Sequence, residues 1–221
     1  EQRKGWRLLW DGKSTRGWKG AKSDAFPENG IEMVDGKIHF LKHQSSASYK
    51  RSGDIVTQEK FDNFELEVDF MFQDGGNSGI KYFVDALTEG DGSTIGFEYQ
   101  VLDKNHPDHS EGVEGNRTIG SLYDLIAAEN LSEKSRGNIR ANGPGRWNRA
   151  RIIVNGGHVE HWINNIKVVE YNRFSQSMKN LIKKSKYNKH KGFGVGANGR
   201  ILLQDHSPGD VWFKNVKIRE F

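Results

Sequence analysis

Alternation of apolar and polar residues is the feature of this sequence that most constrains its fold. The clearest case is Phe64-Glu-Leu-Glu-Val-Asp-Phe-Met-Phe72, in which large apolar residues recur at every second position. Successive side chains of a β-strand point to opposite faces, so this pattern predicts a strand with one buried face. Comparable segments predict further strands at residues 37–41, 78–85, 149–154, 159–163, 166–171, 193–197, 201–206 and 211–219, and one that begins at residue 97.

Turn signals separate these segments, and helical signals are weak. The two glycines after Asn155 and the pair Asn164-Asn165 are expected to form tight hairpin turns. Residues 174–184 predict a short helix, residues 121–130 an irregular turn, and the polar residues 132–148 a long loop. Roughly ten strands with almost no helix predict an all-β sandwich of two antiparallel sheets. No linker divides the sequence, so we expect residues 1–221 to form a single domain.

Composition agrees with such a fold and limits the classes of function. The chain has 26 Gly, which suit many turns, and its 6 Trp, 6 Tyr and 12 Phe can fill a core although only 34% of its residues are hydrophobic. There is no Cys, which excludes disulfides, thiolate metal sites and a Cys nucleophile. No apolar run approaches the length of a membrane span.

The net charge of +4 is a mild excess of basic residues that is spread along the chain. The densest basic run extends from Lys179 to Lys191, and Tyr187 is the one aromatic residue within it that could stack on a base. Single-stranded nucleic acids are bound by basic grooves with several stacking aromatics. The run is therefore expected to be a solvated loop or helix face, and no nucleic-acid partner is predicted.

The segment from Phe97 to His106 carries the first candidate functional residues. Alternation places Phe97 and its apolar neighbours on one strand face and Glu98 and Gln100 on the other. An adjacent carboxylate and amide can exchange hydrogen bonds with sugar hydroxyls, and the carboxylate can also transfer protons. Asp103 and His106 follow where the strand enters a loop. A solvent-exposed polar face is the alternative reading of this pattern.

A second polar strand end supports a site rather than an ordinary surface. In Ile201-Leu-Leu-Gln-Asp-His206, Gln204 and His206 share one face, whereas Asp205 lies on the other. Titratable groups at the ends of strands are frequent components of functional sites. The two segments together indicate that Glu98, Gln100, Gln204 and His206 line a common cleft.

Eight blocks of sequence, in the same order along nearly the whole chain, resemble the 3-keto-disaccharide hydrolase domain family. They are Leu8-Leu-Trp-Asp-Gly-Lys-Ser-Thr-Arg-Gly-Trp18, Gly76-Asn-Ser-Gly-Ile80, Glu98-Tyr-Gln-Val-Leu-Asp103, Gly120-Ser-Leu-Tyr123, Arg146-Trp-Asn148, His161-Trp-Ile-Asn164, Leu203-Gln-Asp-His206 and Val211-Trp-Phe-Lys-Asn-Val-Lys-Ile218. The resemblance implies a concanavalin-like jelly-roll sandwich that binds sugar on its concave sheet and acts on glycosides oxidised at C3. It also implies a bacterial, exported protein. Since the sequence begins at Glu1, either removal of a signal peptide or trimming fits, and we expect a periplasmic or extracellular location.

Two departures affect what can be carried over from related proteins. The family often has an Arg shortly after its Asn-Ser-Gly-Ile block, where this chain has Lys81. Glucanases of the same broad fold use Glu-x-Asp-x-Glu on one strand, and the matching positions here are Glu98, Gln100 and Leu102. The paired-carboxylate mechanism of ordinary glycosidases is therefore not supported on that strand.

A C3 ketone acidifies the hydrogen on C2, so β-elimination of the C1 substituent becomes feasible with one base, one acid and donors to the enolate. Glu98 and His206 are the acid and base candidates in either order. Asp103 is a third catalytic candidate, which either a bulge or the strand end can turn toward the cleft. The substrate-binding candidates are Asn77, Ser78, Lys81, Gln100, His106, Tyr123, Trp162 and Gln204.

A non-catalytic, lectin-like sugar-binding module is the alternative function. These acidic and imidazole groups can also bind a divalent cation, but no spacing identifies metal ligands. The oligomeric state is not determined by the sequence.

Overall fold

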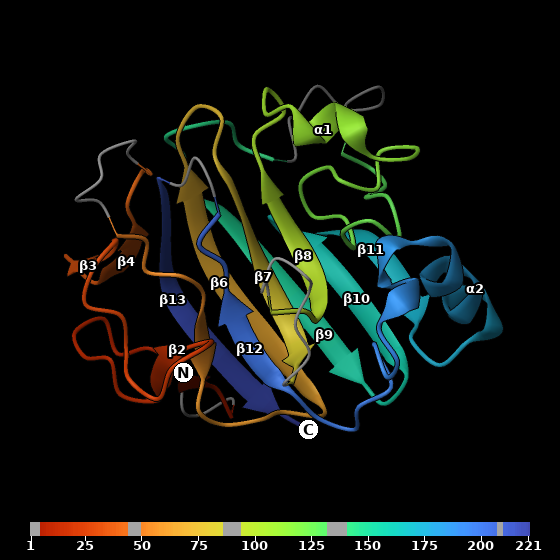
Figure 1. The fold of residues 1–221 in the computed structure, drawn as a ribbon, viewed down its shortest axis with the longest axis horizontal. Helices are drawn as coiled ribbons and strands as arrows, with labels where there is room; N and C mark the ends of the chain where they lie inside the picture. The colour runs from red at the N-terminus through yellow and green to blue at the C-terminus, as the bar shows by residue number, and fades with distance from the viewer. Residues whose placement is uncertain (1–4, 44–49, 86–93, 132–140, 207–209) are drawn as a thin grey trace.

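The computed structural model describes residues 5–43, 50–85, 94–131, 141–206 and 210–221. Two antiparallel sheets are stacked against each other, as the sequence predicts (Figure 1). The larger, eight-stranded sheet has the order β11-β10-β9-β6-β13-β4-β3, and β1 pairs with β13. Its strands are β1 (Arg7–Leu8), β3 (Ile31–Val34), β4 (Lys37–Phe40), β6 (Phe64–Phe72), β9 (Asn148–Asn155), β10 (His158–Ile163), β11 (Ile166–Asn172) and β13 (Val211–Glu220).

The smaller, five-stranded sheet has the order β2-β5-β12-β7-β8. Its strands are β2 (Trp18–Gly20), β5 (Ile55–Thr57), β12 (Arg200–Leu203), β7 (Asn77–Val84) and β8 (Phe97–Leu102). Neighbouring strands of this sheet come from distant parts of the chain, because β12 lies between β5 and β7. The sheet therefore brings the two polar segments of the sequence, at the ends of β8 and β12, onto one surface.

Aromatic side chains fill the space between the sheets. Phe64 and Phe70 from β6 meet Tyr82 from β7 and Tyr99 from β8 in edge-to-face contacts. All four side chains belong to one buried hydrophobic cluster that joins both sheets. Edge-to-face pairs add to the free energy of burial, so few aliphatic residues are needed to stabilise this core.

A buried chain of hydrogen bonds crosses the core. The Tyr82 hydroxyl lies 2.8 Å from His161 Nε2 and 2.7 Å from the Tyr171 hydroxyl, and His161 Nδ1 lies 3.0 Å from the Gly120 carbonyl oxygen. Burial lowers the pKa of His161 to about 4, so its ring is neutral at pH 7. His161 is therefore a buried, hydrogen-bonded residue of the core.

We expect Tyr82→Phe to lower the free energy of unfolding by about 1–3 kcal/mol, because His161 and Tyr171 then lose partners inside the core. Urea unfolding followed by fluorescence measures this change. Tyr99→Phe is the matched control, since within the described part of the chain the Tyr99 hydroxyl makes one hydrogen bond, of 3.2 Å to the Trp162 carbonyl oxygen. An equal loss of unfolding free energy in both variants would show that this series of hydrogen bonds adds no more stability than one bond does.

Two hairpins and one helix match the local sequence signals. β9 and β10 are joined through Gly156 and Gly157, and β10 and β11 through Asn164 and Asn165, which both have positive φ. Helix α2 (Gln176–Lys184) begins after Ser175, whose hydroxyl accepts a hydrogen bond from the Met178 N–H. A 3₁₀ turn follows as η2 (Lys186–Lys189), and a short helix α1 (Asp108–Glu111) follows β8. Among the described residues, no helix is long and apolar enough to cross a bilayer.

The strand predicted at residues 193–197 is wrong. These residues form turns, because Gly192 and Gly194 both have positive φ, which interrupts an extended conformation. Four short strands were not predicted, since two to four residues are too few for a visible alternation: β1, β2, β3 and β5. The loop predicted at residues 132–148 lies partly outside the described residues.

Candidate active site

Strand register places a row of residues across the outer face of the five-stranded sheet. Gly79 of β7 lies opposite Gln100 of β8, and the Gln204 N–H donates to the Gly79 carbonyl oxygen. Leu203 pairs with Ile55, so Gln204 lies opposite Asp54. We call Gln100, Gly79, Gln204 and Asp54 the polar row. The alternate residues of these strands, including Ile55, Ile80, Tyr99 and Leu203, belong to the core.

The next row across the same face contains a charged pair and an apolar patch. Lys81 lies opposite Glu98 on one side and Leu202 on the other, and Leu202 lies opposite Val56. Leu202 and Val56 pack with Val84 in a small cluster separate from the main core. This face therefore combines ionisable groups with a small apolar cluster that is itself buried, since its three side chains are at most 2% exposed.

Lys81 and Glu98 form an ion pair that is almost fully buried. Lys81 Nζ lies 3.5 Å from Glu98 Oε2 and donates a 2.9 Å hydrogen bond to the Thr94 carbonyl oxygen. Each of the two residues is only 5% exposed. Because a buried charge is retained only when it is paired and hydrogen-bonded, this arrangement fixes a carboxylate and an ammonium group next to each other.

Gly79 provides the space that the Glu98 carboxylate occupies. A Cβ atom at Gly79 would lie 2.4 Å from Glu98 Oε1 and 2.8 Å from its carboxyl carbon. The carboxylate therefore extends over Gly79 and lies between the flanking positions Gln100 and Gln204 of the polar row. A residue without a side chain is thus a component of the site.

We expect Gly79→Ala to lower activity by about a hundredfold, since displacement of a reacting group by about 1 Å can have an effect of that size. The displacement also disturbs the buried Lys81–Glu98 ion pair, so the melting temperature is expected to fall as well. Initial rates and thermal denaturation measure the two effects. Gly143→Ala is the matched control, because a Cβ there meets nothing within 4 Å. Full activity of Gly79→Ala would rule out the inferred position of the carboxylate.

A pocket of about 460 Å³ opens beside the polar row. Gln204 and Asp54 form part of its wall, and Thr94 connects it to the Lys81–Glu98 pair. His206, three residues beyond the end of β12, also lines it. The remaining lining residues are Gly20, Ala21, Lys22, Ser23, Arg51, Ser52, Gly53 and Asp205.

Sequence reasoning missed Asp54 as a site residue and did not recognise the role of Asp205. The buried Asp205 carboxylate accepts hydrogen bonds from the Ser52 hydroxyl and the Gly53 N–H at 3.0 and 2.9 Å, and it lies 2.7 Å from His43 Nε2. Its own N–H donates to Asp54 Oδ1 at 2.9 Å. Asp205 therefore holds the segment before β5 in place. The Gly53-Asp54 pair resembles an ordinary turn, so no local signal marks Asp54.

A second set of polar contacts extends from the other end of the polar row. Gln100 Nε2 donates to Asn77 Oδ1 at 3.2 Å, and Asn77 Nδ2 donates to Asp108 Oδ2 at 2.9 Å. His106 Nδ1 accepts a hydrogen bond from the Asp108 N–H. Gln100 is 1% exposed, yet its Oε1 has no hydrogen-bond partner among the described residues. An unpaired buried acceptor is costly, so this atom is a candidate contact for a ligand hydroxyl.

Two of the candidate residues have structural partners instead of facing the pocket. Asp103 follows β8, and its carboxylate accepts hydrogen bonds from the Gly75 and Asn105 N–H groups at 2.8 and 3.3 Å. This closes the turn before β7, and no bulge directs Asp103 toward Glu98. Ser78 is fully buried on the opposite side of β7, and its hydroxyl donates to the Gln204 carbonyl oxygen.

The two aromatic candidates lie in different places. Tyr123 is next to the site: its N–H donates to the Glu98 carbonyl oxygen, and burial, together with the Glu98 carboxylate, raises its pKa. Lys186 Nζ lies 4.7 Å from the centre of the Tyr123 ring. Trp162 belongs to β10 of the other sheet, where it lies opposite Arg151 and donates to Glu160. The geometry does not bring Trp162 to the polar row.

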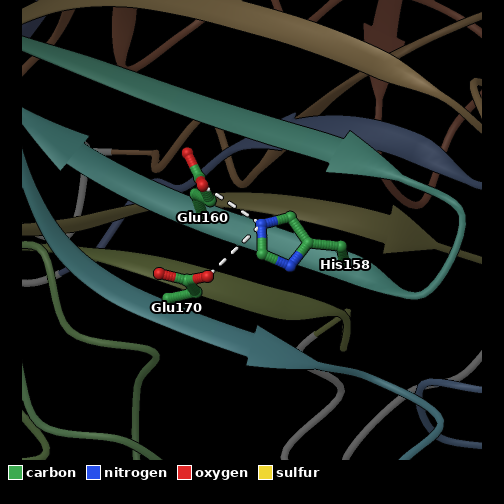
Figure 2. A group of neighbouring side chains, drawn as sticks. All are labelled: His158, Glu160 and Glu170. Carbon is green, nitrogen blue, oxygen red and sulfur yellow. Dashed lines mark hydrogen bonds and ion pairs between the residues drawn. The ribbon is translucent and has the colours of Figure 1, made fainter.

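One group of three potential metal ligands occurs among the described residues, and it lies on the larger sheet. Figure 2 shows His158, Glu160 and Glu170 on the paired strands β10 and β11, with ligand atoms within 4.8 Å of one another. Lys167 Nζ forms ion pairs with both carboxylates, so their charge is already neutralised in part. This group is not part of the candidate active site.

The sequence matches the family described as the 3-keto-alpha-glucoside-1,2-lyase-like domain over residues 5–219. The chain belongs to this family. A 3-keto-disaccharide hydrolase of Bacteroides thetaiotaomicron is 35% identical over 236 aligned positions, which cover 97% of this chain and 78% of that protein.

Solved structures agree with this family membership. A putative glycosyl hydrolase from Parabacteroides distasonis is 29% identical, covers 100% of this chain and 95% of its own, and superimposes with a TM-score of 0.82. A Bacillus subtilis protein with a galectin-like fold is 12% identical, covers 97% of this chain and 94% of its own, and has a TM-score of 0.57, which supports the lectin-like sandwich alone. The predicted fold class and the predicted resemblance are both confirmed.

Proposed function

We propose that this family member is an enzyme that cleaves the glycosidic bond of 3-keto-disaccharides or related 3-keto-glycosides. The observation that carries the proposal is the buried Glu98 carboxylate held 3.5 Å from the Lys81 ammonium beside an open pocket. Family membership and the 35% identity to a 3-keto-disaccharide hydrolase support it. A binding module needs hydroxyl contacts but has no use for a buried base.

The ion pair matches the chemistry that a 3-keto sugar requires. Removal of the C2 hydrogen leaves negative charge on the oxygen of the adjacent C3 carbon, so the base and the group that stabilises this charge must be neighbours. Glu98 is the base in this proposal, and Lys81 donates to the developing enolate oxygen. Fixed donors in a water-poor site stabilise such charge much better than water does. Gln100 and Gln204 flank Glu98 and are placed to bind sugar hydroxyls.

Elimination followed by hydration gives net hydrolysis. The enolate expels the C1 substituent, which leaves a C1–C2 double bond, and water then adds oxygen at C1 and hydrogen at C2. No carboxylate nucleophile is needed, which fits a strand that carries Glu98 without a second carboxylate at Gln100 or Leu102. The departing oxygen needs a proton, and both His206 and Asp54 line the pocket from which it can come.

Incubation with a 3-keto-disaccharide, with product analysis and calorimetric binding in parallel, tests the proposal. We expect release of both monosaccharide units. Binding without cleavage would favour the lectin-like alternative. An arm with a chelator decides whether the reaction needs a divalent cation, which the sequence left open.

A further inference from the structure

We propose that Asp54 is the general acid that protonates the glycosidic oxygen as it leaves, an inference that rests on the cleavage reaction proposed above. Asp54 directly precedes β5 and shares the polar row with Gln204 and Gly79. It also lines the 460 Å³ pocket. Glu98, whose carboxylate extends over Gly79, is the base at the other side of Gln204.

The spacing of the strands supports this assignment. Gly79 lies on β7 and Asp54 at β5, with only β12 between them. Adjacent strands are about 4.8 Å apart, so two spacings separate these backbone positions by roughly 10 Å. Side chains rising from such positions can contact C2 and the C1 oxygen of one sugar ring held between them.

The local contacts fix the orientation of the Asp54 carboxyl group. Its Oδ1 accepts the Asp205 N–H, and its backbone carbonyl accepts the Ala21 N–H at 2.7 Å. No hydrogen bond to its second oxygen occurs among the described residues, so that oxygen can meet a substrate. Asp205 is in turn held by Ser52 and Gly53. A preorganised group of this kind loses little entropy on reaction.

The electrostatic environment of Asp54 favours the protonated form of its carboxyl group. Burial raises the pKa of Asp54; Lys81 opposes this shift, and the nearby carboxylates of Glu98 and Asp205 add to it. His206, Arg51 and Lys22 are the other charged or titratable groups lining the pocket beside it. A carboxyl group with a raised pKa donates a proton more readily near neutral pH than an exposed one, which would already be ionised.

The proton transfers balance over one turnover. Glu98 takes the C2 proton, the C1–O bond breaks as C1=C2 forms and the C3 ketone returns, and the Asp54 proton goes to the departing oxygen to make an alcohol. Water then adds to C1 while giving a proton to the Asp54 carboxylate, and Glu98 returns its proton to C2. Both carboxyl groups end as they began, and water is the one co-reactant.

Leaving-group dependence tests the assignment, because a good leaving group departs without protonation. For Asp54→Asn we expect a fall in kcat of about a hundredfold to ten-thousandfold with a 3-keto-disaccharide. With 4-nitrophenyl 3-keto-glucoside, whose phenolate leaves readily, the rate is expected to stay close to that of the unaltered protein. Asp54→Ser serves as a second variant if Asp54→Asn folds poorly. Asp35→Asn, in the β3–β4 turn, is the matched control and should behave as the unaltered protein.

His206→Gln provides the direct comparison, since His206 is the other proton donor on the pocket wall. We expect it to change the rates with both substrates by a similar factor. Leaving-group dependence in His206→Gln but not in the Asp54 variants would overturn the assignment, as would equal losses with both substrates in the Asp54 variants. If the unaltered protein cleaves neither substrate, the proposed function itself fails, which is a distinct result.

Discussion

Cleavage is expected to require the C3 ketone. A 3-keto-disaccharide should be split into its two sugar units, whereas the unoxidised parent disaccharide should give no detectable product under the same conditions. Without the ketone, the C2 hydrogen is not acidic and Lys81 has no enolate to stabilise. The strand that carries Glu98 also lacks the second carboxylate needed for ordinary glycoside hydrolysis. Chromatography of the released sugars measures both rates.

A reaction in D₂O separates elimination from direct displacement at C1. Hydration of a C1–C2 double bond places deuterium at C2 of the product once the protonated Glu98 carboxyl has exchanged with solvent, whereas direct attack of water on C1 leaves the original hydrogen. The free 3-keto monosaccharide in D₂O, with and without protein, is the control for exchange after cleavage. Equal rates of cleavage of the 3-keto-disaccharide and of its unoxidised parent would contradict the elimination mechanism.

Replacement of Glu98 by Gln should lower kcat for the 3-keto-disaccharide by about a hundredfold to ten-thousandfold, the usual contribution of general acid–base catalysis. The amide keeps the shape of the side chain but cannot take the C2 proton. Sugar binding is expected to survive, because Gln100 and Gln204 are unchanged. Steady-state kinetics and calorimetry together separate the loss of chemistry from a loss of affinity.

Glu160→Gln is the matched control for this variant. Glu160 is also a strand residue paired with a lysine, at 3.4 Å from Lys167 Nζ, but it lies on the larger sheet away from the polar row. Its replacement should leave kcat unchanged. A Glu98→Gln protein that turns over at the normal rate would show that the base lies elsewhere on this surface.

Several features of the fold and the site follow from local sequence. Alternation requires nothing beyond the geometry of a single strand, so the core face of β6 and the shared face of Glu98 and Gln100 can be predicted without a structure. The turns at Asn155 and Asn164 follow from the positive φ values that Gly and Asn tolerate. The segment that continues from β12 marks Gln204 and His206 as candidates for the same reason of alternation.

Pairing between distant strands is decided only in the tertiary structure. Asp54 enters the site because β5 lies against β12, and Asp103 leaves it because its carboxylate binds the turn at Gly75. Trp162 is a substrate-binding candidate in the sequence, but it belongs to the other sheet. The sequence by itself determined which residues alternate into the core and which local turns form, since those preferences arise within a few residues. The neighbours of each strand depend on the burial of a common core by segments far apart in the chain, and only that packing decides which polar side chains meet.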